Sequence, residues 1–247
     1  MLESQPRWLR HFYLIDADSE QIRRLEELRS AQPPPDQTRH EPRRTIEILC
    51  GDFNVLVHQL LDSRPITEKE ASFCLLDQRT FECHWTTIQA LARYKHAGHK
   101  IELFYFLPNA WLDRALAAQE DIDVLDRWWG GTGWAILRGM PPIARAQLVA
   151  NRLKTGFGYA SVKPMPIFDR EGGSRVMYFM IHATDHPEAP RLMARAYRRA
   201  VLPREPVEQL ALELGLESLD LPQDETSGSV PSSEPQGGNQ GGRHLSD

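Results

Sequence analysis

Short apolar runs alternate with helical patterns along the first part of the chain. Four runs have the character of buried strands, at residues 12–16 (FYLID), 45–50 (TIEILC), 72–77 (SFCLLD) and 100–108 (KIELFYFLP). Helical patterns separate them, at about residues 19–29, 54–62 and 84–96. Near-continuous apolar strands are typical of a sheet covered on both faces, and strands alternating with helices are joined by parallel crossovers. The pattern predicts an α/β fold with a doubly wound, mostly parallel sheet.

The rhythm changes after Pro108. Residues 109–141 are expected to form a helical insertion rich in tryptophan, with Trp111, Trp128, Trp129 and Trp134. A helix over about 142–155 then leads into two further runs, 161–168 and 176–183, which are separated by the turn sequence DREGGSR. This turn predicts a C-terminal antiparallel hairpin, after which a basic amphipathic helix follows over about 189–201.

The C-terminal part has a different composition. A short helical extension is expected over residues 203–218, and from residue 219 the chain is rich in Gly, Ser, Pro and Gln without aromatic residues. Such a segment cannot bury enough apolar surface to become ordered. The expected organisation is one domain over residues 1–202, the extension, and a disordered tail over 219–247.

Charge and hydropathy exclude some classes of protein. The formal net charge is -5 and the pI is near 6.0, so binding to nucleic acid would require a local basic patch. No segment approaches the roughly 18 apolar residues of a membrane span, and the first residues lack the apolar stretch of a signal peptide. We expect a cytoplasmic protein without a membrane partner, and reduced, mostly structural thiols at its three cysteines.

Several stretches together resemble the three-Cys-motif partner protein family, TcmP. They are GDFN (51–54), CLLDQRTFECHWTTIQAL (74–91), KIELFYFLPNAWLDRAL (100–116), RWWGG (127–131), LRGM (137–140) and MYFMIHATDHPEAPRLM (177–193). The resemblance covers about residues 11–202. It implies a Rossmann-like fold similar to S-adenosylmethionine-dependent methyltransferases, and a three-Cys-motif protein encoded nearby as the partner. Phage-related or defence-related systems are the implied setting.

One expected part of that fold is missing from the sequence. Family members begin with a strand and a glycine-rich turn before the acid-tipped strand, whereas only eleven residues precede Phe12 here. The missing first strand would lie between the strands at residues 12–16 and 72–77, which would leave two exposed central edges. A truncated gene, a misassigned start codon and a partner that supplies the strand are the three explanations.

The resemblance implies a cofactor site at the carboxyl ends of the first two strands. Asp16, with Asp18 as its substitute, would bind the ribose of S-adenosylmethionine. Asp52 would lie near the adenine amino group, and Phe53 would pack on the ring. The alternative is that these acids cap helices, since Asp is a favoured N-cap residue.

The resemblance also implies acceptor-facing residues at the next two strand ends, namely Asp77, Gln78, Arg79 and Asn109. Asp77 occupies the place where amino-methylating enzymes carry an Asp-Pro-Pro-aromatic motif, although proline is absent here. Independently of the resemblance, Arg79, Glu82 and His84 form a dense cluster of ionisable groups within one loop and helix start, which would bind an anionic substrate or shuttle a proton. The alternatives are a salt bridge between Arg79 and Glu82, and a plain turn residue at Asn109.

Weaker signals have simpler explanations. The insertion tryptophans would stack a nucleic-acid base or, as we expect, anchor helices to the core. The flank formed by Arg191, Arg195, Arg198 and Arg199 would follow a phosphate backbone or form a solvated helix face. His182 and His186 are not expected to bind metal, because Pro187 argues against a helix there.

Three functional hypotheses follow. The first is a methyltransferase-like protein that acts with a three-Cys-motif protein, with nucleic acid as one candidate substrate; this chain alone would then be inactive without the glycine-rich turn. The second is a non-catalytic binding partner or scaffold. The third is a metal-dependent nucleic-acid-processing enzyme that uses Asp77, Glu82 and His84, although the spacing matches no defined metal motif.

Overall fold

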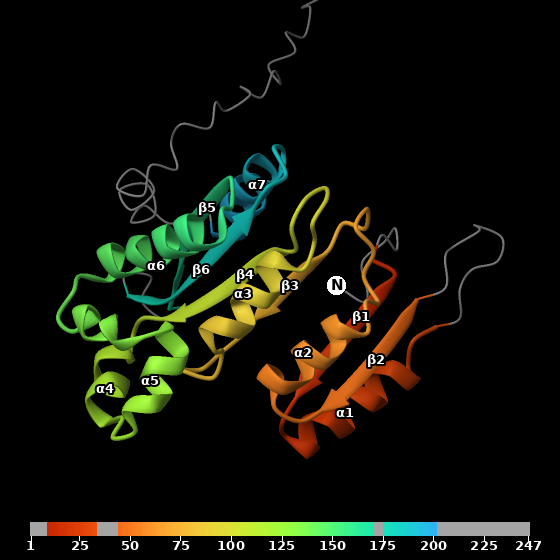
Figure 1. Cartoon of the computed structure of the whole chain (residues 1–247), viewed down its shortest axis with the longest axis horizontal. Coiled ribbons are helices and arrows are strands. Elements are labelled where there is room, and N and C mark those ends of the chain that lie inside the picture. The colour runs from red at the N-terminus through yellow and green to blue at the C-terminus, as the bar shows by residue number, and fades with distance from the viewer. Residues whose placement is uncertain (1–8, 34–43, 170–174, 202–247) are drawn as a thin grey trace, which may run out of the picture.

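The computed structural model describes residues 9–33, 44–169 and 175–201 of the chain. Among these residues the fold is mixed α/β, with two separate sheets rather than one (Figure 1). The smaller sheet pairs two parallel strands, β1 (His11–Asp16) and β2 (Thr45–Cys50). The larger sheet has the order β3-β4-β6-β5, with bounds β3 (Phe73–Leu76), β4 (Glu102–Pro108), β6 (Val176–Thr184) and β5 (Ser161–Phe168).

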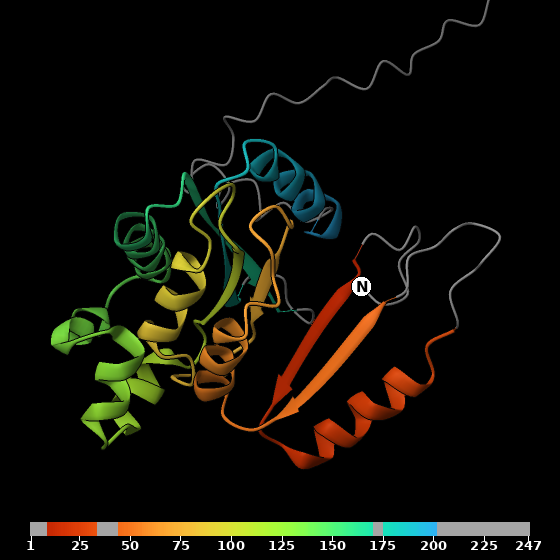
Figure 2. The same ribbon diagram turned by 45° about the vertical axis from the view of Figure 1, so that its right-hand side comes forward.

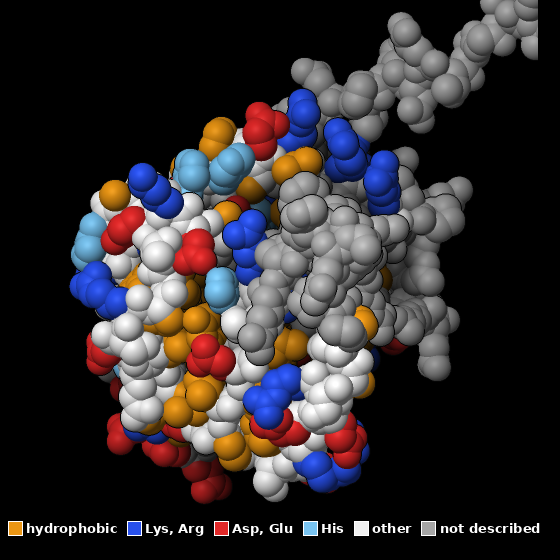
Figure 3. All heavy atoms as spheres, turned by 90° about the vertical axis from the view of Figure 1, so that its right-hand side faces the viewer, with side chains coloured by type: hydrophobic (Ala, Val, Ile, Leu, Met, Phe, Trp, Pro, Cys, Tyr) orange, Lys and Arg blue, Asp and Glu red, His pale blue; other side chains and the backbone are white. Residues whose placement is uncertain are grey.

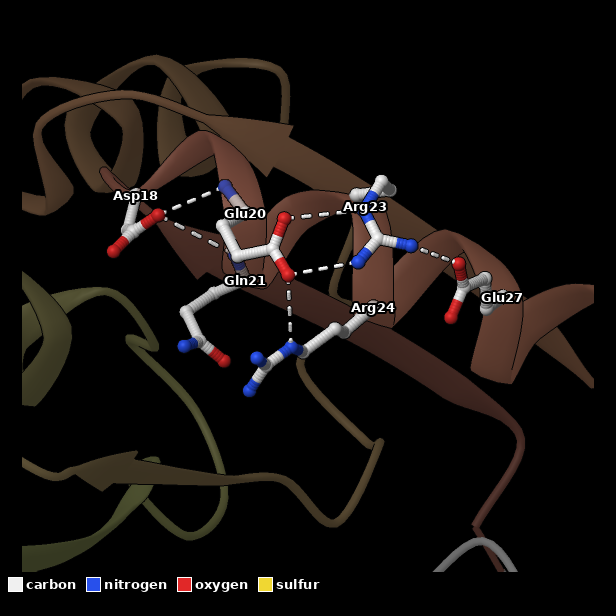
Figure 4. A network of polar contacts seen from close by, with 6 residues as sticks. All are labelled: Asp18, Glu20, Gln21, Arg23, Arg24 and Glu27. Atoms are coloured by element: carbon white, nitrogen blue, oxygen red, sulfur yellow. Dashed lines mark hydrogen bonds and ion pairs between the residues drawn. The ribbon is translucent and has the colours of Figure 1, made fainter.

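Helix α1 (Ser19–Ser30) connects the two strands of the smaller sheet. Asp18 is its N-cap, and Asp18 Oδ1 accepts hydrogen bonds from the backbone N–H groups of Glu20 at 2.8 Å and Gln21 at 3.4 Å. An exposed ladder of ion pairs follows, in which Arg23 binds Glu20 and Glu27 (Figure 4). None of the residues of α1 is buried, so local capping and charge pairing contribute to this helix more than packing does.

The larger sheet combines one parallel pair with an antiparallel hairpin. Strands β3 and β4 are parallel and are joined through α3 (Trp85–Arg93), whereas β6 runs antiparallel to both β4 and β5. The predicted C-terminal hairpin is therefore confirmed, as are the parallel pairings within each sheet. The tip of its turn, residues 170–174, lies outside the described residues.

Short helices fill the stretch between β4 and the long helix α6 (Pro142–Phe157). They are α4 (Leu112–Ala118), α5 (Ile122–Trp129) and the 3-10 helix η2 (Thr132–Leu137). Trp128, Trp129 and Trp134 are buried here, which confirms the expectation that these tryptophans anchor helices to the core. The guanidinium carbon of Arg152 lies 3.6 Å from the ring centre of Trp129 and 4.2 Å from that of Trp85, and so joins this region to α3.

The hydrophobic core belongs to the larger sheet. Leu103, Tyr105 and Leu107 alternate along β4 with at most 2% of their surface exposed, and they pack with residues of α3 and α6. By contrast, none of the residues of β1 or β2 is buried, and Cys50 at the end of β2 is exposed. The prediction of strands covered on both faces is thus wrong for the smaller sheet, where no strand pairs with β1 on its second edge among the described residues.

The last described element is α7 (Ala189–Val201), which matches the predicted basic helix. It packs on β5 through Tyr197, whose hydroxyl donates a hydrogen bond to the carbonyl of Pro166 at 2.5 Å. None of the helices within the described ranges is long and apolar enough to cross a membrane. The predicted extension over 203–218 and the tail over 219–247 lie outside the described part of the chain.

Candidate acidic site at the strand ends

Three carboxylates lie at the carboxyl ends of parallel strands, as the sequence predicts. Asp16 is the last residue of β1, Asp52 follows β2, and Asp77 follows β3. In open α/β sheets, ligands bind beyond these strand ends, so this is the natural place to look for a site. These three strand ends do not belong to one continuous sheet, because β1 and β2 form one sheet and β3 belongs to the other.

Asp16 and Asp52 are brought together by the pairing of β1 with β2. The backbone N–H of Gly51 donates a hydrogen bond to the carbonyl of Asp16 at 3.0 Å, directly before Asp52. The carboxylate of Asp16 accepts a bond from the N–H of Asp18 at 2.8 Å, while the Asp18 carboxylate caps α1. The capping alternative is therefore confirmed for Asp18, and Asp16 stabilises the turn that leads into the cap.

Asp52 is the N-cap of α2 (Phe53–Asp62), as the simpler alternative predicted. Its Oδ1 atom accepts hydrogen bonds from the backbone N–H of Asn54 at 2.7 Å and from Asn54 Nδ2 at 3.0 Å. Phe53 is partly buried and packs against the main hydrophobic cluster. Both hydrogen bonds of the Asp52 carboxylate are accepted by its Oδ1 atom. The Phe53 side chain contributes to core packing.

Asn54 joins the two parts of the site, and the sequence analysis did not single it out. Its Nδ2 donates to the carbonyl of Glu82 at 2.8 Å, and its Oδ1 accepts from the N–H of His84 at 2.8 Å and from the hydroxyl of Thr87 at 3.0 Å. Asn54 is 8% exposed. An asparagine at the second position of a helix, two residues after a capping Asp, is the only signal in the sequence.

The loop after β3 divides its side chains between solvent and core. Asp77 and Arg79 are exposed, whereas Gln78 is 3% exposed. Gln78 Nε2 donates to the carbonyl of Phe106 at 3.2 Å, and its Oε1 accepts from the N–H of Cys83 at 3.3 Å. Gln78 thus holds the loop against β4, and Asp77 and Arg79 are the members of this group that face solvent.

Asn109 lies at the end of β4 and binds the start of β6. Its backbone N–H donates to the carbonyl of Met177 at 3.0 Å, and its Nδ2 donates to the carbonyl of Val176 at 3.0 Å. Next to it, Trp111 Nε1 donates to the carbonyl of Arg79 at 3.2 Å. The loops after β3 and β4 are therefore joined by the bond from the Trp111 side chain to the Arg79 carbonyl, while Asn109 is tied to β6.

His84 and Glu82 have different surroundings. Burial lowers the pKa of His84 below its ordinary value of 6.5, the nearby charge of Arg127 lowers it further, and the Asp52 carboxylate opposes this shift. Glu82 is exposed and accepts a bond from the N–H of Thr80 at 2.7 Å. The alternative, a salt bridge between Arg79 and Glu82, does not occur among the ion pairs of the described residues, and Glu82 instead stabilises its own turn.

The residues considered for metal or nucleic acid lie elsewhere. His182 is buried on β6, stacks on Phe104, and lies 3.0 Å from a carboxylate oxygen of Glu102. Within the described ranges, no group of three His, Cys, Asp or Glu residues is arranged to hold a metal ion. On α7, Arg191 lies 3.6 Å from Glu188 as an exposed ion pair.

A nucleoside cofactor fits this arrangement only in part. The family resemblance would assign the ribose to Asp16 and the adenine amino group to Asp52. However, these two carboxylates already accept backbone bonds, and the described residues include no strand or turn between β1 and β3. The described part of the chain therefore lacks the turn beneath which a cofactor would be held.

Comparison with known proteins gives no match: no family model, no curated protein and no solved structure is significantly similar to this chain.

Proposed function

We propose that this chain is a protein of the three-Cys-motif partner type that acts by binding another protein, with its methyltransferase-like fold as a scaffold. The observation that supports this role most directly is the interrupted sheet, since β1 and β3 each lack a strand on one edge among the described residues. Capping by Asp18 and Asp52 agrees with it, because it gives these conspicuous acids a structural role.

The proposed partner is the three-Cys-motif protein that the family resemblance implies. The test is to express the two proteins together and to measure co-elution in size-exclusion chromatography. A complex of defined stoichiometry is the expected result. Separate elution of two well-folded proteins would overturn the proposed role.

The second candidate is a methyltransferase-like enzyme that binds S-adenosylmethionine. It is favoured by the position of Asp16, Asp52 and Asp77, each directly at the carboxyl end of a parallel strand. In this candidate the cofactor would lie over Asp16 and Asp52, and Asp77 and Asn109 would face the acceptor.

Calorimetric titration of S-adenosylmethionine into the chain separates the two candidates. The scaffold role predicts no binding heat up to about millimolar ligand. Binding that is lost in Asp16→Asn but kept in Asp62→Asn would favour the enzyme instead. Asp62 is a suitable control because it is an exposed acid at the end of α2, away from the strand ends.

A further inference from the structure

Strands β1 and β3 each have one edge that pairs with no other strand among the described residues. Bonds from Thr45 N–H to the Arg10 carbonyl and from Gly51 N–H to the Asp16 carbonyl connect β1 to β2. Along a strand, the backbone groups of alternate residues point to opposite edges. The N–H and carbonyl groups of the intervening β1 residues therefore point away from β2; these residues are His11, Tyr13 and Ile15.

Strand β3 has the corresponding free edge. The bond from Glu102 N–H to the Ser72 carbonyl connects it to β4, so the backbone groups of Phe73 and Leu75 point away from β4. Unpaired edge groups of this kind form a template for pairing with another strand.

The two free edges face each other. In Figures 1 and 2, β1 is the strand of the smaller sheet that lies nearer to β3, and the arrows of β1 and β3 point to the same end of the molecule. At the amino ends, His11 Nε2 lies 3.7 Å from Glu70 Oε1, in the segment before β3. Burial raises the pKa of Tyr13, and the nearby carboxylates of Glu47 and Glu70 raise it further. Because β1 and β3 run in the same direction, one inserted strand would have the same orientation relative to both edges.

The surroundings of the gap are apolar. Phe12, Leu14 and Ile15 on β1 are only partly buried, and Leu75 on β3 is 48% exposed. Figure 3, which views the molecule from the side of the two-stranded sheet, shows hydrophobic side chains reaching the surface between charged ones. A two-stranded sheet is marginally stable in water, and apolar side chains around two free edges would be buried by a third strand.

We propose that an extended apolar segment of another polypeptide inserts between β1 and β3 as a strand and joins the two sheets into one. The proposal rests on the partner-binding function above and specifies its contact surface. The inserted segment is about five residues long, the usual length of a strand, and mostly apolar because apolar side chains of β1 and β3 flank the two edges.

The sequence itself argues for a donor outside these 247 residues. The ranges not described, 1–8, 34–43, 170–174 and 202–247, contain no run of four apolar residues. In addition, residues 1–8 directly precede β1, and a parallel strand requires a crossover of about a dozen residues. The occupant is therefore a free apolar segment that lies outside these 247 residues.

The experiment uses the full chain and a synthetic peptide. The peptide is labelled with fluorescein and contains a central run of about six valine and alanine residues between lysines. Fluorescence anisotropy is expected to show saturable binding. N-methylation of alternate peptide amides should abolish it, because the edge hydrogen bonds are lost while the protein is unchanged.

Two proline variants locate the peptide. Tyr13→Pro removes an N–H that points into the gap, whereas Ile48→Pro removes one on the outer edge of β2, and proline is tolerated at such free-edge positions. Tyr13→Pro should weaken binding about tenfold or more, and Ile48→Pro should leave it unchanged. Circular dichroism checks that both variants fold.

Three results would overturn the inference. The first is no binding up to the solubility limit of the peptide, and the second is equal weakening of peptide binding by both proline variants. The third is self-association of the chain that Tyr13→Pro abolishes, because a second copy would then be the occupant. Failure of strand insertion can be distinguished from failure of the proposed partner-binding function. If the three-Cys-motif protein co-elutes equally well with the wild-type chain and with Tyr13→Pro, the partner role stands and strand insertion fails.

Discussion

Leu103, Tyr105 and Leu107 on β4 are at most 2% exposed, whereas none of the residues of β1 or β2 is buried. The sequences of these strands are similarly apolar, so hydrophobicity does not explain the difference. Strand β4 has a neighbour on each edge and helices packed against it, while β1 pairs on one edge only among the described residues. The comparison teaches that burial in this protein depends on the completeness of the sheet.

The two regions are held together through α2. This helix begins directly after β2, and Asn54 in its first turn binds the loop and helix that follow β3. Ile15 of β1 also packs against the main cluster. The smaller sheet is therefore attached to a stable body rather than stabilised by a core of its own.

The largest expected difference between the regions concerns truncation of apolar side chains. Leu103→Ala should lower the free energy of unfolding by about 2–5 kcal/mol, because it removes a fully buried side chain and leaves a cavity. Ile48→Ala on β2 should cost about 1 kcal/mol, because that side chain is already partly exposed. Urea unfolding monitored by circular dichroism measures both values. Equal costs would show that the smaller sheet is as well packed as the larger one in solution.

An intermediate effect is expected at the junction. Asn54→Ala should lower the free energy of unfolding by about 2 kcal/mol, because the Glu82 carbonyl, the His84 N–H and the buried Thr87 hydroxyl lose their hydrogen-bond partner. Asn151→Ala on α6 is the matched control, since that residue is exposed. Hydrogen exchange provides a second measurement. If β1 and β2 exchange no faster in Asn54→Ala than in the wild type, Asn54 does not hold the sheets together.

The smallest effect concerns pH. Burial lowers the pKa of His84 in the folded chain below the ordinary 6.5, so the unfolded chain binds a proton more readily. The contribution of His84 to stability is then complete above pH 6.5 and is lost as the pH falls through the folded pKa. His84→Gln should reduce the pH dependence of the unfolding midpoint between about pH 5 and 7. An unchanged slope in His84→Gln would contradict this assignment.

Much of the fold could be predicted because each element depends on a local pattern. Strand β1 and helix α7 follow from one apolar run and one amphipathic stretch, and the hairpin of β5 and β6 follows from the glycine turn between them. The exposure of β1 and β2 was not predictable in the same way. An apolar run indicates a strand, but its burial depends on neighbours that are distant in sequence or not described.

The candidate site was predicted less completely than the fold. Capping by Asp18 and Asp52 follows from sequence, because an N-cap needs only an Asp before a helix. The bridge from Asn54 to His84 joins residues thirty positions apart, and no local pattern indicates it. The sequence places Gln78 beside Asp77 and Arg79 as a site residue, whereas the structure directs its amide into the core.

The opposed edges of β1 and β3 also affect how the chain behaves during synthesis. Because the two edges belong to different strands, β1 of one copy can pair with β3 of the next, and such head-to-tail contacts build open filaments rather than closed dimers. Under the strand-insertion proposal, a cell that makes this chain in excess over the strand donor would accumulate a polymerising species. Supply of the two proteins would then have to be matched in amount and in time.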